Sequence, residues 1–373
     1  MSRIRIGVLF GGRSTEHEVS ILSARSIIGA LDPQRFEAVP LYVDRTGRWL
    51  VGESLQRLIQ SEKSQEYVYL PPDPTQRALV PAARAGDSGP RLPPLDVVFP
   101  VFHGLNGEDG TIQGVLELAN VPYVGSGVLG SALGLDKIYM KRAFAAVGLP
   151  VVDYLPTTRR RFEQDPTALV SEVEAWLGYP CFAKFANSGS SVGTTKAHNR
   201  EELLAGLRLA AGFDRKLLVE RGIDARELEV SVLGNDEPVA SVVGEIIPAR
   251  EFYDYEAKYL DEGSTLAIPA QIPAELSEKI RAMAVQAFQA VDAAGMARVD
   301  FFLERKTNRV YLNEVNTIPG FTRISMYPKL WEASGLPYPR LLERLIELAL
   351  ERFEDKQRSQ TAIDSRLLTQ AEA

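Results

Sequence analysis

The sequence predicts an α/β protein of two or three domains, and two observations support this prediction. The chain has 373 residues, which is more than one ordinary hydrophobic core accommodates. Its first third alternates strand-like and helix-like segments, a pattern typical of a parallel sheet with helices on its faces. We therefore expect an N-terminal domain built on such a sheet.

The N-terminal elements follow from the positions of the apolar residues. Residues 4–10, 37–43 and 95–101 are short apolar runs and predict strands. Residues 20–31 carry apolar residues at helical spacing and predict a helix between the first two strands. Residues 70–94 are rich in Pro, Gly, Arg and Ala without clear periodicity, which predicts a long surface excursion.

The rest of the chain carries further helical patterns and one hairpin. Residues 133–147 predict a helix that ends at Gly148-Leu149-Pro150, and residues 275–294 predict a strongly amphipathic helix. The strand-like runs 297–303 and 310–314 are separated by a turn, which predicts an antiparallel hairpin. Further predicted elements are the helices 203–211 and 338–352, the strand 216–220, and a frayed polar tail after Asp355.

Composition argues against several classes of protein. Apolar residues make up 45% and charged residues 24%, as in a soluble globular protein. The net charge of -7 repels phosphate backbones, so no nucleic-acid partner is expected. The single cysteine, Cys181, excludes an intrachain disulfide and is predicted to be a small core residue. No apolar run reaches the ~20 residues of a membrane span, and no signal peptide is evident, so we expect a cytoplasmic location and no membrane partner.

The predicted hairpin carries a candidate metal site. Side chains alternate along a strand, so Arg298 and Asp300 share one face of the first strand, and Glu314 and Asn316 share one face of the second. If the strands pair, the side chains of Asp300, Glu314 and Asn316, here called the metal triad, converge. Two carboxylates and one carboxamide suit Mg²⁺ or Mn²⁺, which commonly bridge protein to nucleotide phosphates. The alternative is a solvated hairpin with ordinary polar side chains.

Two glycine-containing loops are candidate ligand sites. Lys184 ends a strand-like run and leads into small residues, whose backbone N–H groups could close over a phosphate. The lysine precedes the glycines, so the P-loop pattern is not matched, and such a loop can also be a plain connector. Gly11-Gly12 follow the first strand without the spacing of a dinucleotide-binding turn. Glu16, at the start of the next helix, could cap that helix or anchor a cationic substrate.

A histidine and an aromatic segment are further candidates. His103 leaves a buried strand at the end where open α/β sheets bind ligands, whereas His17 and His198 are predicted to lie at the surface. One histidine cannot build a zinc site. Residues 252–264 interleave aromatic and charged residues outside any helical or strand period, which predicts a lid loop or, alternatively, an aromatic surface or subunit contact.

Five segments together resemble the D-alanine–D-alanine ligase family. They are GG-x-S-x-E-x-EVS at 11–20, HG-x-x-GEDG at 103–110, GSSVG at 189–193, FYDYEAKY at 252–259 and NEVNT-x-PG at 313–320. The resemblance extends to about residue 350 and is weakest over 44–94. It implies an ATP-grasp fold of three domains. These are an N-terminal Rossmann-like domain over 1–132, a central subdomain over 133–222 and a C-terminal subdomain over 223–355, followed by a polar tail over 356–373.

The resemblance also implies a reaction. ATP and two D-alanines would give D-alanyl-D-alanine, ADP and phosphate, for the synthesis of peptidoglycan precursors. The carboxylate of the first D-alanine would attack the γ-phosphate to form an acylphosphate, and the amine of the second would then displace phosphate. The implied cofactors are ATP as a substrate and two Mg²⁺ or Mn²⁺ ions, with K⁺ as a further candidate. A homodimer is also expected.

The family's site residues carry over position by position. The metal triad would hold the metal ions. ATP would be bound by Lys137, Lys184, Glu220, Ile223, Glu227, Phe252, Lys258 and Phe302. The first D-alanine would be held by Glu16, with Ser190 and Tyr259 as hydrogen-bonded partners that close the lid and with His103 nearby. Arg298 and the N–H of Gly320 would form an oxyanion hole, and the second D-alanine would be bound by Ser325 and Met326. Tyrosine at 259 would also favour a dipeptide product over D-alanyl-D-lactate.

Three other functions fit parts of the pattern. Another ATP-grasp carboxylate–amine ligase would share the metal triad but not Glu16, Ser190 and Tyr259. A Rossmann oxidoreductase would use the first glycine turn, bind NAD and leave the metal triad unexplained. A non-catalytic nucleotide-binding regulator would require broken metal or Arg298 positions, and those positions are intact.

Overall fold

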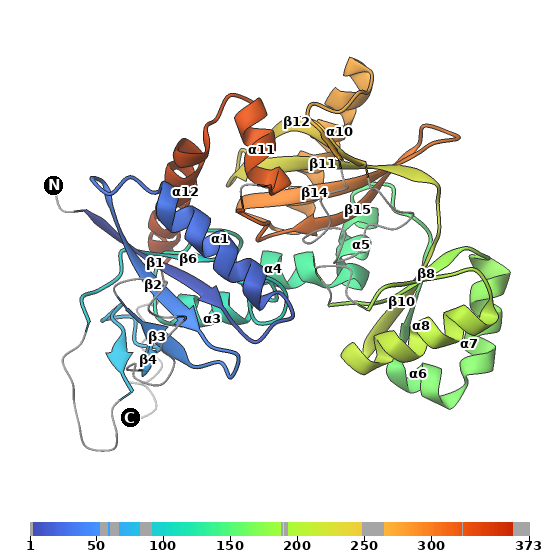
Figure 1. Ribbon diagram of the computed structural model, residues 1–373, viewed down its shortest axis with the longest axis horizontal. Coiled ribbons are helices and arrows are strands. Elements are labelled where there is room, and N and C mark those ends of the chain that lie inside the picture. Colours follow the sequence, from blue (N-terminus) through green and yellow to red (C-terminus); the bar gives the residue numbers. More distant parts are fainter. Residues whose placement is uncertain are drawn as a thin grey trace, which may run out of the picture.

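The computed structural model contains three β-sheets, each packed against its own helices (Figure 1). It describes residues 3–52, 59, 67–82, 92–187, 189, 193–247, 265–322 and 324–360. Within these ranges no helix combines the length and the apolar character needed to cross a bilayer.

The N-terminal sheet has the strand order β5-β4-β3-β2-β1-β6. β1 (Ile4–Gly11), β2 (Phe36–Val43) and β6 (Val97–Pro100) run parallel, and α1 (His17–Ala30) connects the first two. α3 (Thr111–Leu118) follows β6. The predicted parallel arrangement of strands and helices is therefore confirmed for this part of the sheet.

Three short antiparallel strands extend this sheet and were not predicted: β3 (Trp49–Val51), β4 (Tyr67–Tyr69) and β5 (Val80–Pro81). β5 lies inside the segment predicted to be a surface excursion, and Leu70 and Leu79 of that segment are buried in the core. The prediction was therefore wrong for Leu70 and for residues 78–81, whereas Pro72, Pro74 and Thr75 between them are exposed. Strands of two or three residues are too short to show a period-2 pattern, so the sequence offered no signal for them.

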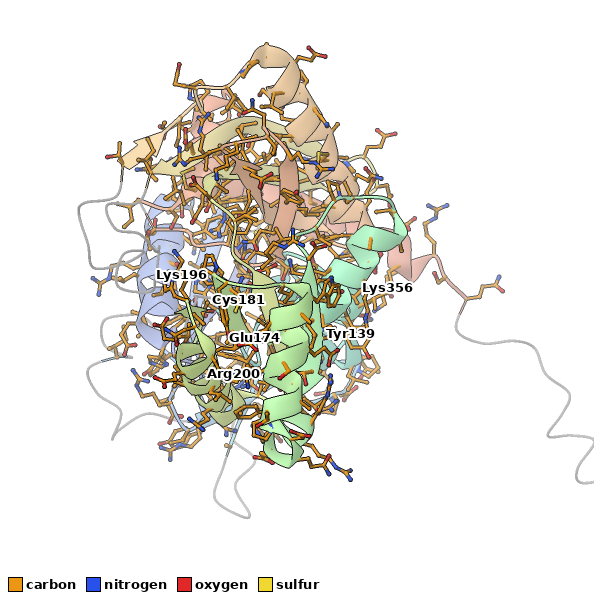
Figure 2. All side chains as sticks on the ribbon, turned by 90° about the vertical axis from the view of Figure 1, so that its right-hand side faces the viewer. Tyr139, Glu174, Cys181, Lys196, Arg200 and Lys356 are labelled. Atoms are coloured by element: carbon orange, nitrogen blue, oxygen red, sulfur yellow. The ribbon has the colours of Figure 1, made fainter. Side chains whose placement is uncertain are left out.

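A second sheet of four antiparallel strands has the order β7-β10-β8-β9. Its strands are β7 (Tyr154–Thr158), β8 (Cys181–Phe185), β9 (Thr195–Ala197) and β10 (Lys216–Arg221). Figure 2 looks toward this unit, whose helices are α6 (Arg159–Gln164), α7 (Pro166–Trp176) and α8 (Arg200–Phe213). Cys181 is fully buried in the core between the sheet and these helices, as predicted.

The third sheet has five antiparallel strands in the order β13-β12-β11-β14-β15. They are β11 (Ala225–Gly234), β12 (Val239–Ile247), β13 (Thr265–Ala267), β14 (Gly295–Glu304) and β15 (Val310–Asn316), with α10 (Ala274–Ala290) packed against them. The predicted hairpin is confirmed, because β14 pairs antiparallel with β15. In that pairing Asp300 lies opposite Glu314, and Arg298 lies opposite Asn316.

The single helix predicted over 133–147 is instead two helices, α4 (Val128–Leu135) and α5 (Lys137–Ala146). The break occurs at Asp136, whose carboxylate accepts hydrogen bonds from the N–H groups of Ile138 and Tyr139, each at 3.1 Å. Aspartate is among the best N-cap residues, and with Asp136 as its cap the new helix starts at Lys137. The new start places Lys137 in the first turn of α5.

The two C-terminal helices connect the third sheet to the first. α11 (Met326–Ala333) precedes α12 (Tyr338–Gln357), and Leu341 and Leu345 of α12 share a buried core with Ile6 of β1. Figure 1 shows α12 beside the N-terminal sheet. The helix continues past Asp355, where the tail was predicted to begin.

Candidate active site

A cavity of about 620 Å³ lies between the second and third sheets. It brings together five of the residues predicted to bind ATP, namely Lys184, Glu220, Ile223, Glu227 and Phe302. Of the other three, Lys137 pairs with Glu314 at the start of α5, and Phe252 and Lys258 are outside the described residues. Polar residues that were not predicted also line the cavity, among them Lys196, Arg226 and Glu245.

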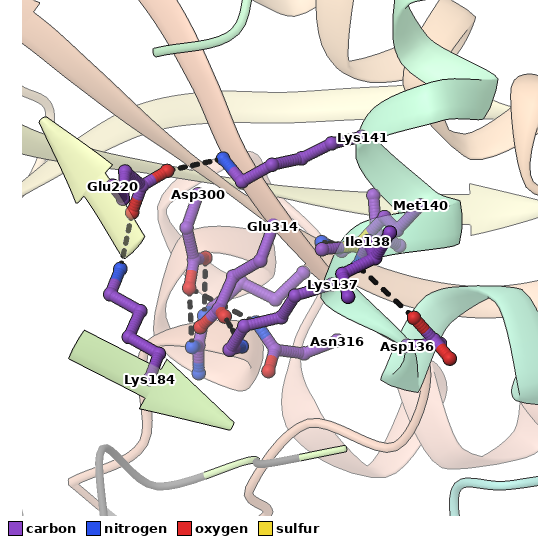
Figure 3. A network of polar contacts seen from close by, with 12 residues as sticks. Asp136, Lys137, Ile138, Met140, Lys141, Lys184, Glu220, Asp300, Glu314 and Asn316 are labelled. Atoms are coloured by element: carbon purple, nitrogen blue, oxygen red, sulfur yellow. Dashed lines mark hydrogen bonds and ion pairs between the residues drawn. The ribbon is translucent and has the colours of Figure 1, made fainter. Parts of the chain in front are cut away.

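Glu220 presents a buried carboxylate to this cavity, between two lysines (Figure 3). One carboxylate oxygen lies 2.5 Å from Nζ of Lys141, and the other accepts a hydrogen bond from Lys184. Burial acts to raise the pKa of Glu220, but the two ammonium groups outweigh it and lower that pKa to about 2. The carboxylate is therefore ionised at neutral pH and able to accept a hydrogen bond from an amino group.

The metal triad lies on the hairpin of β14 and β15, with Lys137 and Lys184 nearby (Figure 3). The Asn316 amide donates to Asp300 Oδ2 at 3.0 Å, and Glu314 pairs with the ammonium of Lys137. The three oxygen-bearing side chains thus occupy one side of the hairpin. Lys137 reaches them because α5 begins directly beside β15.

The donor set of the metal triad suits a hard divalent cation. It offers only carboxylate and amide oxygens, the ligand types that Mg²⁺ and Mn²⁺ prefer. Asp300 and Glu314 lie in register across the hairpin, and their side chains are only 13% and 12% exposed. Lys137 and Arg298 neutralise these carboxylates, so a metal ion would compete with an ammonium and a guanidinium for the same oxygens.

Arg298 makes a two-pronged contact with Asp300. Its Nε and Nη2 donate to the two carboxylate oxygens at 2.8 and 2.7 Å, and its Nε also lies 3.0 Å from Glu229 Oε2. Burial acts to lower the pKa of Arg298, and the charges of Asp300 and Glu229 raise it well above its usual value. Arg298 is therefore a fixed positive charge in this part of the site.

Gly320 follows the metal triad in a turn that leaves no room for a side chain. A Cβ at this position would lie 2.7 Å from the hydroxyl of Ser325. That hydroxyl accepts a hydrogen bond from the N–H of Thr322 at 3.0 Å. Met326 begins α11, and its side chain is buried among Ile246 and Leu330, so only its main chain could contact a ligand.

A second cleft, of about 440 Å³, is lined by residues of the N-terminal unit and of the four-stranded unit. Glu16 lines it, with its carboxylate between Gly104 and Gly189: a Cβ on either glycine would lie 3.0 or 2.9 Å from Glu16 Oε2. Glu16 is the N-cap residue of α1, yet its side chain makes no capping hydrogen bond. The capping alternative was therefore wrong. Ser190 and Tyr259 are outside the described residues.

The three histidines occupy different environments. His103 is buried, with Nδ1 3.1 Å from the carbonyl oxygen of Ile318 and Nε2 3.4 Å from the Ser23 hydroxyl. His198 is exposed, as predicted. The prediction for His17 was wrong: it is buried, with its ring nitrogens 2.8 Å from the Gly12 carbonyl oxygen and 3.2 Å from the Tyr42 hydroxyl. His17 begins α1, and the packing of this helix end against β2 buries it.

Comparison with known proteins shows the family of this chain. Residues 5–126 match the family model described as "D-ala D-ala ligase N-terminus", and residues 143–347 match the model described as "D-ala D-ala ligase C-terminus". The chain belongs to the D-alanine–D-alanine ligase family. The resemblance seen in the sequence is thereby confirmed.

Relatives in the D-alanine–D-alanine ligase family match nearly the whole chain. The D-alanine–D-alanine ligase of Heliobacterium modesticaldum is 53% identical over 97% of this chain and 98% of its own length. That of Geobacillus kaustophilus is 48% identical over 95% and 97%. Among solved structures, the D-alanine-D-alanine ligase from Coxiella burnetii has a TM-score of 0.83 at 37% identity and covers 96% of this chain and 97% of its own. The VanG D-Ala:D-Ser ligase from Enterococcus faecalis has a TM-score of 0.82 at 35% identity, covering 93% and 100%.

Family membership confirms the ATP-grasp fold and removes the Rossmann oxidoreductase from consideration. Within this ligase fold, sequence reasoning did not single out Lys141, Ser23 or Glu108, which the structure places beside predicted site residues. A signal existed for Lys141, because it follows Lys137 by four positions and so shares a helix face with it. Glu108 lies in the motif at 103–110, which was the available signal for it, although no role was assigned to this residue. Ser23 had no local signal, since its partners His103 and Phe321 lie far along the chain.

Proposed function

We propose that this chain joins two D-alanine molecules in an ATP-dependent reaction that passes through a D-alanyl phosphate, and that the residues described above carry out its steps. The reaction serves the synthesis of peptidoglycan precursors, as the family assignment supports. The observation that carries the proposal is the oxygen donor set of the metal triad, which is paired with Lys137 and Arg298 and lies near Lys184 and Glu220 of the cavity (Figure 3). The cleft lined by Glu16 is the second opening.

ATP binds in the cavity between the second and third sheets, which fall in the proposed subdomains 133–222 and 223–355. The Glu220 carboxylate accepts from the adenine amino group, with Ile223 contributing main-chain contacts. Glu227 holds the ribose, and Phe302 and Phe252 pack on the ring. Lys184, Lys137 and Lys258 supply positive charge to the phosphates, because phosphoryl transfer depends mainly on positioning and charge neutralisation.

The metal triad would hold the divalent cations, which would supply positive charge to the phosphates. The ammonium of Lys137 then moves from Glu314 to a phosphate. Arg298 gives up one of its two hydrogen bonds to Asp300 and uses that N–H group to contact the substrate. These exchanges keep every charged group paired as ligands arrive. We carry over from the resemblance two Mg²⁺ or Mn²⁺ ions, K⁺ as a further candidate, a homodimer and a cytoplasmic location as parts of the proposal.

The D-alanine substrates lie on the side of Glu16. Its carboxylate receives the ammonium group of the first D-alanine, with His103 close by. Arg298 and the N–H of Gly320 stabilise the negative charge that develops on the carbonyl oxygen when the second amine attacks. Ser325 and the main chain of Met326 receive the carboxylate of the second D-alanine. Ser190 and Tyr259 close the lid, which keeps water from the acylphosphate.

The proposal is tested by phosphate release from MgATP with and without D-alanine, followed by mass analysis of the product. We expect D-alanine-dependent release and a D-alanyl-D-alanine product, with L-alanine as the inactive control. Absence of D-alanine-dependent release would refute the proposed function. Competition between D-alanine, D-serine and D-lactate near neutral pH tests the role of Tyr259, because preferential use of D-lactate would contradict it.

A further inference from the structure

The turn that carries Gly320 is held by side chains from the other end of the chain. Ile318 and Phe321 flank the dipeptide Pro319-Gly320 on either side. The main-chain groups of Ile318 contact His103 and Glu108, and the N–H of Phe321 contacts Ser23. These contacts join residues between 210 and 298 positions apart.

The directions of the hydrogen bonds follow from the chemistry of each partner. The Ile318 carbonyl oxygen only accepts, so Nδ1 of His103, 3.1 Å away, carries the hydrogen. Burial lowers the pKa of His103, which keeps the ring neutral and leaves Nε2 as an acceptor. The Ser23 hydroxyl, 3.4 Å from Nε2, therefore donates to it. The same hydroxyl accepts from the N–H of Phe321 at 3.3 Å.

Glu108 contacts the N–H group of Ile318, whereas His103 contacts its carbonyl oxygen. Its Oε1 accepts from the N–H of Ile318 at 3.2 Å, and its Oε2 accepts from the N–H of Gly104 at 2.8 Å. The side chain is buried, and both oxygens face N–H donors. Burial and the nearby charge of Glu16 raise the pKa of Glu108 to about 8. Both oxygens of a carboxyl group carry lone pairs and can accept, whereas a glutamine would have to turn its NH₂ group toward one of these donors.

We propose that Ser23, His103 and Glu108 are positioning residues that set the main-chain N–H of Gly320, so that α1 and the segment between β6 and α3 complete the oxyanion hole of the ligation step. This inference rests on the proposed function, in which Gly320 stabilises the tetrahedral intermediate. Ser23 and Glu108 touch no substrate and act through the turn. His103 acts through its Nδ1 contact with Ile318, in place of a direct hydrogen bond to D-alanine.

The two chemical steps should respond differently to substitutions around the turn. An oxyanion hole at Gly320 serves the attack of the amine but not the first phosphoryl transfer. In Ser23→Ala and Glu108→Gln we expect kcat for ligation to fall by about tenfold or more, as small misplacements of catalytic groups do. The KM for ATP should stay within about twofold of the wild type. Exchange of ¹⁸O between the bridging and non-bridging positions of ATP reports reversible acylphosphate formation. The rate of this exchange should stay within about threefold of the wild-type rate.

Matched controls lie away from the turn. Ser131→Ala removes a buried hydroxyl whose contact is the Ser126 carbonyl oxygen, and Glu343→Gln neutralises a buried carboxylate paired with Arg35. Both controls should keep the wild-type kcat, and thermal melting shows whether each variant is folded at the assay temperature. Folded Ser23→Ala and Glu108→Gln proteins with wild-type ligation rates would overturn the inference. Equal losses of isotope exchange and ligation would also overturn it, since they indicate a general structural role. Failure of the proposed function is distinct, because the wild-type chain itself would then show no D-alanine-dependent phosphate release.

Discussion

The ammonium of Lys137 lies against the carboxylate of Glu314, although the two residues are 177 positions apart in the sequence. The contact depends on the Asp136 cap, which starts α5 at Lys137, and on β15, which presents Glu314 from the hairpin. Both side chains are nearly buried, with 11% and 12% of their surfaces exposed. The ammonium of Lys137 thus pairs with a carboxylate that we propose as a ligand of a metal ion.

This pairing predicts that Lys137→Met has opposite effects on metal and nucleotide. Without the competing ammonium, Mn²⁺ alone should bind more tightly by up to about tenfold, equivalent to about 1.4 kcal/mol. MgATP should bind more weakly because a positive charge near the phosphates is lost. Electron paramagnetic resonance of free Mn²⁺ and a nucleotide titration measure the two effects. Weaker Mn²⁺ binding in the variant would argue against a metal role for Glu314.

Glu314→Ala tests the metal triad directly. We expect turnover to fall by about 1000-fold, a barrier increase of about 4 kcal/mol, because a ligand of the phosphate-bridging cations is removed. The fold should persist, since the side chain lies beside the cavity and outside the hydrophobic core clusters. Steady-state kinetics and circular dichroism are the measurements. Near-normal turnover would rule out the metal assignment for this residue.

Lys141→Met tests the buried pair behind the nucleotide cavity. The methionine keeps the volume of the lysine stem but removes the charge that lies 2.5 Å from Glu220 Oε1. We expect the KM for ATP to rise by about tenfold while the KM for D-alanine changes little, because Glu220 lines the cavity proposed for ATP and does not line the cleft of Glu16. Arg142→Met, one position away on α5, is a suitable control. Equal changes in both KM values would contradict the prediction.

The pKa of Glu220 predicts how stability depends on pH. Burial raises this pKa, but Lys141 and Lys184 more than compensate and lower it to about 2, below the ordinary value of 4.5. A lowered pKa means that the ionised carboxylate stabilises the fold above about pH 4.5 and that this contribution is lost as the pH falls toward 2. The free energy of unfolding in urea, measured for wild type and Glu220→Gln between pH 6 and pH 3, should show a difference that shrinks toward the acid end. A difference independent of pH would disprove the ion-pair interpretation.

The local patterns of the sequence were sufficient for the hairpin and for the relative placement of its polar side chains. Alternation along each strand put Arg298 and Asp300 together on β14, and Glu314 and Asn316 together on β15. The turn between the strands predicted their antiparallel pairing, which brings both sets to the same side of the hairpin. Periodicity also located the long helices, because a repeating apolar face is a property of neighbouring residues.

Other features depended on competition between local and distant contacts. One helix was predicted across 133–147, but the Asp136 side chain caps a second helix there, and its backbone pairs with Asn187 in an isolated bridge. His17 was predicted at the surface because its neighbours in the sequence are polar. Tyr42 and Gly12, brought beside it by the sheet, bury it and bind both ring nitrogens.

By itself the sequence determined the kinds of chemistry available in this protein: a hard oxygen donor set, an arginine beside it, and an acidic residue at the first helix. Only the tertiary structure decided which groups meet. It placed Lys141 against Glu220, Lys137 against Glu314, and Ser23 and Glu108 around the turn of Gly320. The physical reason is that secondary structure follows from interactions a few residues apart, whereas these contacts form only when separate sheets pack together and bury the groups between them.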